Sequence, residues 1–119
     1  MYFEIMQMKY DGGSRLCDEF KYHNSSYWTE HNKCVDFEEY NTVYTGVIET
    51  EQNEMVNHIL DRIYTKFNFD KPEDYHGASV CVSDIICLIH NGKPVYYFVD
   101  SIGYRELEIA QVYRFGIEV

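Results

Sequence analysis

Four side chains that could bind zinc fall within an 18-residue stretch near the start of the chain: Cys17, His23, His31 and Cys34. Two thiolates and two imidazoles are a donor set that holds zinc tetrahedrally. Their spacing matches no compact zinc finger, and the chain's four cysteines include no Cys-x-x-Cys pair. An accidental grouping is therefore the better interpretation. We expect no metal ion and no cofactor, and zinc binding by these four residues stays as the alternative.

Acid–base chemistry is the second possibility, because a pair of carboxylates stands near a serine in the C-terminal half, although the only nearby histidines, His76 and His90, lie in predicted loops. The candidates for a nuclease, or for a factor that promotes cleavage of a guide RNA, are Asp84, Asp100 and Glu106, with His76. However, the chain carries no hydrolase, Walker, Rossmann or zincin signature. We therefore expect that the protein is not an enzyme, and the nuclease remains the alternative.

Structural roles explain the same motif residues better. Asp84 interrupts two apolar stretches, and Asp100 and Ser101 follow a predicted strand. Such short polar side chains accept hydrogen bonds from nearby backbone N–H groups and fix turns. Gly103 would permit a tight backbone conformation. Arg105 would pair with Asp84 or Asp100 and fix the loop.

The charge of the chain excludes several functions. The 119 residues hold 10 lysines and arginines against 20 aspartates and glutamates, a net charge of −10. Residues 1–60 hold 11 acids and 4 bases (−7), and residues 61–119 hold 9 acids and 6 bases (−3). A protein that binds the phosphate backbone of a nucleic acid needs a positively charged surface, so direct binding to the DNA backbone is not expected.

Composition also limits the class of protein. Hydrophobic residues make up 45% and aromatic residues 17% of the chain, too much for a disordered tail. No uncharged apolar run approaches the ~18 residues of a membrane span. Residues 1–4 lack a basic region followed by an apolar run, so we expect no signal peptide. We expect one soluble, cytoplasmic domain over residues 1–119.

Two acidic clusters and one aromatic pair are the candidate partner-binding residues. Acidic clusters of this kind are usually no more than solvated surface residues. The functional interpretation is that they form a surface that binds a basic groove on a partner protein. The aromatic pair would either contact a partner or anchor its loop to the core, and anchoring is favoured for the only tryptophan. The set is Asp36, Glu38 and Glu39; Glu49, Glu51 and Glu54; and Tyr27 with Trp28.

The elements that would position these residues follow from hydrophobic periodicity. Residues 1–9 and 42–48 have strand patterns, and residues 14–36 have no clear period and form a long loop or an irregular excursion. Apolar residues at three- and four-residue steps predict an amphipathic helix over about 53–67. Thr50 or Asn53 would cap that helix, and Glu51 and Glu54 would suit its positive end.

The C-terminal half carries the clearest pattern. Two apolar runs flank Asn91-Gly92, which predicts a β-hairpin over about 85–99. Residues 104–112 fit a short helix or a strand, and alternation toward Val119 favours a last strand. The sum is an α+β domain with one main helix on a mostly antiparallel sheet.

Three blocks of this sequence, in the same order, resemble the YodL-like domain of Gram-positive conjugative elements and phages. The first comprises residues 60–68 and 72–77, the second residues 79–86, and the third residues 97–107. The residues Tyr44-Thr45-Gly46 precede these blocks and fit the same pattern, so the resemblance spans about residues 44–107. It does not cover residues 1–43, which form an acidic, variable N-terminal part. Cys81 and Cys87 depart from the usual pattern at small or apolar positions.

The resemblance implies a setting and a function. Such domains occur in mobile elements, alone or in large proteins thought to blunt host defences, and some small acidic ones look like anti-CRISPR proteins against the type II-A effector nuclease. We therefore expect an inhibitor that blocks guide RNA or DNA engagement in a bacterial cytoplasm. The alternatives are an anti-restriction DNA mimic and a non-inhibitory interaction module, which would be a homodimer or a scaffolding domain.

Overall fold

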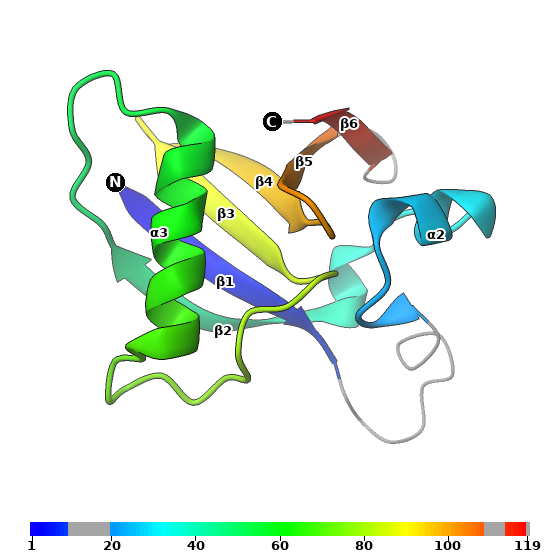
Figure 1. Ribbon diagram of the computed structural model, residues 1–119, viewed down its shortest axis with the longest axis horizontal. Helices are drawn as coiled ribbons and strands as arrows, with labels where there is room; N and C mark the ends of the chain where they lie inside the picture. Colours follow the sequence, from blue (N-terminus) through cyan, green and yellow to red (C-terminus); the bar gives the residue numbers. More distant parts are fainter. Residues whose placement is uncertain (10–19, 109–113, 119) are drawn as a thin grey trace.

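Six antiparallel strands form one sheet in a computed structural model that describes residues 1–9, 20–108 and 114–118 (Figure 1). The strand order is β2-β1-β3-β4-β5-β6. Helix α3 lies across one face of this sheet. The strands are β1 (Tyr2–Met8), β2 (Tyr40–Val47), β3 (Ile85–His90), β4 (Lys93–Val99), β5 (Tyr104–Glu108) and β6 (Arg114–Glu118). The helices are α2 (Ser25–Glu30), η1 (Phe37–Glu39, a 3-10 turn) and α3 (Val56–Phe69).

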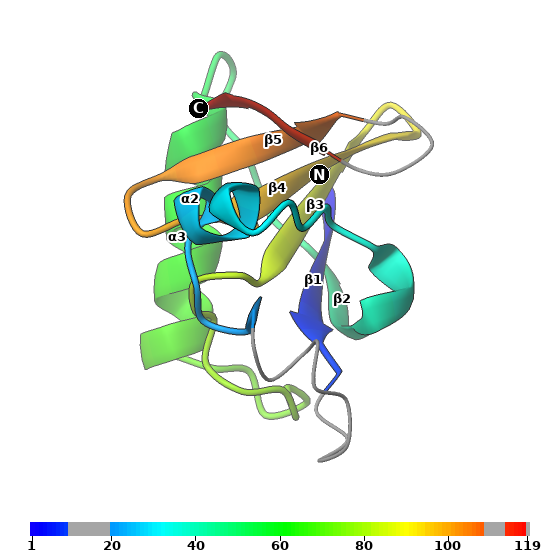
Figure 2. The same cartoon turned by 90° about the vertical axis from the view of Figure 1, so that its right-hand side faces the viewer.

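The sheet separates two hydrophobic cores, because strand residues alternate between its faces. In β1, Phe3 and Ile5 pack in the core under α3, whereas Met6 and Met8 pack in the core on the other face. That second core also holds Trp28 of α2. Figure 2 shows α3 and the segment leading into β2 on opposite sides of β1. The sequence therefore forms an α+β domain, as predicted, with a layer on each face of the sheet.

Helix α3 confirms the predicted amphipathic helix but begins later. Its buried side chains recur at three- and four-residue steps: Ile59, Leu60, Ile63 and Phe67. The predicted capping by Thr50 or Asn53 is wrong, because the N-cap is Met55, which makes no side-chain hydrogen bond. Asn53 has a φ of 63°, in the left-handed region, so the helix cannot begin there.

The predicted β-hairpin is confirmed by β3 and β4. Its turn residues Asn91 and Gly92 have φ angles of 50° and 76°, as the favoured two-residue hairpin turn requires. Residues 85–88 of β3 are buried, which fits a central strand covered on both faces. Of the stretch predicted as a short helix or a strand, Tyr104–Glu108 forms strand β5, and residues 109–112 lie outside the described part of the chain. Strand β6 is the expected last strand.

The predicted irregular segment, residues 14–36, contains a short helix. Residues 10–19 lie outside the described part of the chain. In the remainder, the Asn24 side chain accepts a hydrogen bond from Tyr27 N (3.0 Å) and caps α2. No helix among residues 1–9, 20–108 and 114–118 has the length and apolarity needed to cross a bilayer.

Candidate functional site

Asp84 is the centre of a buried polar network at the start of β3. Its side chain is almost fully buried, and its Oδ2 accepts hydrogen bonds from Cys81 N (2.9 Å) and Gln7 Nε2 (3.0 Å). Burial raises the pKa of Asp84 to about 6, although both hydrogen bonds act in the opposite direction. Asp84 thus fixes a turn by accepting a hydrogen bond from the backbone N–H of Cys81, which is the kind of structural role that was expected of it.

Gln7 and Ser83 extend this network to other segments. Gln7 Nε2 also donates to Ala78 O (3.0 Å), and Ala78 N donates to Gln7 Oε1 (3.1 Å). Ser83 adopts a φ of 80°. Its Oγ accepts from Tyr22 N (2.9 Å), and its carbonyl accepts from Tyr40 Oη (2.6 Å). The network therefore ties β1, β2 and the segment before α2 to the start of β3.

Asp100 connects the end of β4 to α2. Its Oδ1 accepts from Ser25 N (3.0 Å) and Ser101 N (2.9 Å), and its Oδ2 accepts from the Ser25 hydroxyl. Asp100 N donates to Gly103 O (3.1 Å), and Gly103 has a φ of 70°. Gly103 therefore supplies the left-handed conformation that was expected of it.

Replacing Asp100 with alanine is expected to lower the free energy of unfolding by about 1–3 kcal/mol, because the Ser25 donors lose their acceptor. Serine at position 101 offers the matched control, since Ser101→Ala leaves the Asp100 carboxylate in place. Urea unfolding followed by circular dichroism gives both values. Equal losses in the two variants would contradict this role.

Arg105 does not make the ion pair that its sequence position suggested. Among the described residues it pairs with neither Asp84 nor Asp100, whose carboxylates accept hydrogen bonds from Gln7, Ser25 and backbone N–H groups. Arg105 lies opposite Phe98 on the β4–β5 ladder. Its Nε is buried, and no described residue bonds it. The predicted fixing of the loop by Arg105 is wrong.

The aromatic pair of α2 divides between core and surface. Trp28 has no exposed surface, packs against Phe20 and Phe98, and donates from Nε1 to Phe20 O (3.0 Å). The anchoring interpretation is therefore right for Trp28, and its side chain offers no contact surface. Tyr27 is half-buried between two histidines, with ring centroids 3.8 Å from His23 and 4.1 Å from His31.

The two histidines of the possible zinc group thus flank Tyr27. His31 Nδ1 also lies 2.8 Å from Tyr27 O. Cys34 is exposed, and Cys17 lies outside the described residues. Within the described segments, no three His, Cys, Asp or Glu side chains gather as a metal site would require.

The first acidic cluster lies at the beginning of β2. Asp36 is exposed and caps η1, because its Oδ1 accepts from Glu38 N (2.9 Å). Glu38 is exposed as well. Glu39 is different: it is half-buried and forms an ion pair with Lys33. Within this cluster, therefore, only Asp36 and Glu38 present carboxylates that no ion pair among the described residues neutralises.

The second acidic cluster follows the end of β2. Glu49 and Glu51 are exposed, but the Glu54 side chain is only 6% exposed. Glu54 Oε2 accepts from Arg62 Nε (2.8 Å), and Oε1 accepts from Glu51 N (3.0 Å). The hydrogen bond from Glu51 N, followed by those from Arg62, lowers the pKa of Glu54. Glu54 therefore holds the β2–α3 connection against α3, and the sequence alone did not show this role.

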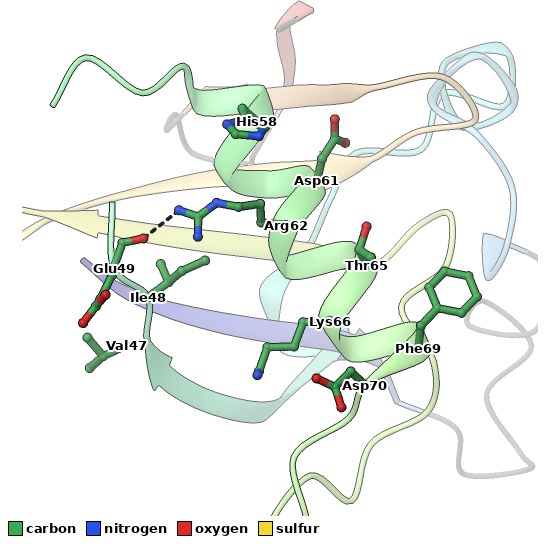
Figure 3. Close-up of a pocket in the computed structure, with 10 residues that line it drawn as sticks. All are labelled: Val47, Ile48, Glu49, His58, Asp61, Arg62, Thr65, Lys66, Phe69 and Asp70. Carbon is green, nitrogen blue, oxygen red and sulfur yellow. Dashed lines mark hydrogen bonds between the residues drawn. The ribbon is translucent and has the colours of Figure 1, made fainter. Parts of the chain in front are cut away.

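A groove of about 670 Å³ runs between this connection and the outer face of α3 (Figure 3). Arg62 Nη2 donates to Glu49 O (2.6 Å) within it, and Phe69, which is 83% exposed, stands at its far end. Acidic and basic side chains alternate along the groove, so it has no single sign of charge. The lining is Val47, Ile48, Glu49, His58, Asp61, Arg62, Thr65, Lys66, Phe69 and Asp70.

Comparison with known protein families shows to which family the chain belongs. A family model described as the YodL-like domain matches residues 2–109. The chain belongs to the YodL-like domain family. No curated protein and no solved structure matches it. The match includes residues 2–43, which the sequence blocks did not cover, so the YodL-like domain includes β1, α2 and the beginning of β2.

The motif residues of this YodL-like domain are joined by backbone ladders and hydrogen bonds to the N-terminal segments. Gln7, Ser25 and Tyr40 make several of these contacts, and sequence analysis did not identify them as site residues. Gln7 is a polar residue between Met6 and Met8 in the most apolar part of β1, and that irregularity was the available signal. Ser25 and Tyr40 gave none, because their partners lie 75 and 43 positions away.

Proposed function

We propose that this YodL-like domain is an anti-defence inhibitor of a mobile genetic element. Its exposed carboxylates would occupy a basic, nucleic-acid-binding groove of a host defence nuclease. The type II-A CRISPR effector is the first target to test, because small acidic proteins that the chain resembles look like anti-CRISPR proteins. Such effectors hold their guide–target duplex in a positively charged channel.

One observation carries this proposal: the surface acids differ from the structural acids. Asp36, Glu38, Glu49 and Glu51 are exposed, and no ion pair among the described residues neutralises them. The carboxylates of Asp84, Asp100 and Glu54, which join separate segments of the fold, are instead buried or half-buried. Unpaired surface charges of one sign speed association with a basic partner and select it.

Charge reversal tests this interpretation. We expect Asp36→Lys with Glu38→Lys, or Glu49→Lys with Glu51→Lys, to weaken binding to the guide-loaded effector about tenfold or more, mainly through association. Reversal at the exposed Glu73 and Asp74 is the matched control and should cost less affinity. Surface plasmon resonance at low and high salt gives the affinities.

Salt and activity readouts decide between the alternatives. Binding that stays constant from low to high salt would contradict the charge-based mechanism. A plasmid-protection assay in hosts with CRISPR or restriction active separates the effector from a restriction enzyme, and protection in neither host would favour a non-inhibitory module. Magnesium-dependent RNA cleavage by the protein alone would instead support a nuclease. Cleavage that persists in Asp84→Ala and Asp100→Ala variants that keep the fold would contradict it.

A further inference from the structure

The outer edge of β2 is an unused edge of the sheet. β2 stands at one end of the strand order and pairs only with β1 among the described strands (Figure 1). An edge strand presents N–H and C=O groups that another chain can pair with. Natural proteins usually protect such an edge with charged side chains or proline, but residues 40–47 contain neither. The register shift opposite Ile5 and Met6 leaves residues 44–47 in regular pairing.

The hydrogen-bond pattern identifies which backbone groups face outward. Ile48 N donates to Met1 O (2.9 Å), and Met1 N donates to Ile48 O (2.9 Å). In an antiparallel ladder, mutually bonded pairs alternate with pairs whose N–H and C=O groups point away from each other. The Met1–Ile48 pair is mutually bonded, so the Phe3–Gly46 pair is the next bonded pair along β2. The pairs between and beyond them, Tyr2–Val47 and Glu4–Thr45, are not bonded to each other, so the backbone groups of Val47 and Thr45 point away from β1. No backbone or side-chain group of the described residues bonds them there.

The side chains beside these groups suit an added strand. Thr45 and Val47 are exposed, and Val47 keeps 65% of its surface accessible. Its register partner Tyr2 is 61% exposed on the same face. An apolar side chain of an added strand would pack against this pair, as cross-strand neighbours do.

Charge determines what kind of strand fits. Asp36 and Glu38 stand just before β2, and Glu49 and Glu51 stand just after it. If a second copy paired through β2, acids of one copy would lie beside acids of the other in either strand direction. Like charges at such positions are unfavourable. A foreign strand with lysine or arginine at both ends meets complementary charge instead.

We propose that β2 receives an extended segment of a partner protein by strand addition. The segment has an uncharged β-forming centre that bonds to the backbone of Thr45 and Val47, and basic residues on both sides of it. Strand addition of this kind draws affinity from the backbone and specificity from the side chains. The inference holds for any protein partner and does not depend on the proposed nuclease target.

Synthetic peptides of sequence KKTVTVTKK and EETVTVTEE test the inference directly. We expect the first to bind at least about tenfold more tightly than the second at low salt, with a difference that shrinks as salt rises. Amide hydrogen exchange at Thr45 and Val47 should be fast in the free protein and slow in the complex, with Gly46 slow in both. Unchanged exchange at Thr45 and Val47 in saturating KKTVTVTKK would overturn the inference.

A proline variant removes the edge without removing the ladder. Thr45→Pro deletes an N–H that points away from β1, a position where edge strands tolerate proline. It should weaken KKTVTVTKK binding about tenfold or more, whereas Thr45→Val keeps the N–H and binds like the wild type. Circular dichroism verifies the fold. Equal binding by both variants, or a wild-type dimer that Thr45→Pro converts to monomer, would overturn the proposal of a foreign strand.

Discussion

Replacing Trp28 with alanine is expected to lower the free energy of unfolding by about 3–5 kcal/mol. The indole is fully buried against Phe20 and Phe98, so its removal leaves a large cavity beneath α2. The Phe20 carbonyl also loses the Nε1 donor. Since small domains have only about 5–15 kcal/mol of stability, this one change removes much of it.

Tyr27 provides the matched control for this prediction. It is the neighbouring aromatic residue of the same helix, but it is only half-buried, and it lies between His23 and His31. Tyr27→Ala should therefore cost clearly less than Trp28→Ala. Both losses are measured by urea unfolding with circular dichroism, because Trp28 is the only tryptophan and its fluorescence disappears in the variant. Equal losses would show that α2 does not depend on its buried face.

The importance of Trp28 also shows where sequence reasoning ends. The β3–β4 hairpin was predictable because Asn91-Gly92 favours a local turn, and α3 because its apolar residues repeat at the helical period. Helix α2 has six residues, too few to be stable by itself. It depends on Ser25 binding Asp100 and on Trp28 packing against Phe98, and contacts across 70–75 positions leave no periodic signal.

The same limit applies to the candidate site. Acidic composition correctly suggested an acidic surface, and Asp36, Glu38, Glu49 and Glu51 are exposed. The sequence did not separate these from Glu54, because the role of Glu54 depends on its contact with Arg62, eight positions later on α3. The outward backbone groups of β2 are likewise invisible in the sequence, since they follow from the strand order.

The second large effect is expected from pH, through Asp84. Burial raises the pKa of this carboxyl from its ordinary value of 3.8 to about 6. The folded protein therefore holds the proton more tightly than the unfolded chain between those values. The stabilising contribution of the neutral form is complete below about pH 4 and is lost as the pH rises through about 6.

The size of this contribution follows from the shift. About two pKa units at 1.36 kcal/mol each give about 3 kcal/mol in full, of which about 1 kcal/mol should be present at pH 5. Other groups titrate over the same range, and the lowered pKa of Glu54 acts in the opposite direction. The contribution of Asp84 must therefore be isolated with a variant that cannot titrate at this position.

Asp84→Asn is that variant, because an amide carbonyl can still accept the hydrogen bond from Cys81 N but carries no titrating proton. We expect the free energy of unfolding of the wild type, minus that of Asp84→Asn, to rise by about 1 kcal/mol from pH 7 to pH 5 and further toward pH 4. Chemical unfolding at each pH measures both proteins. A difference that is constant across this range would show that Asp84 titrates normally and that water reaches its carboxylate; a difference that falls with decreasing pH would reverse the sign of its coupling to folding.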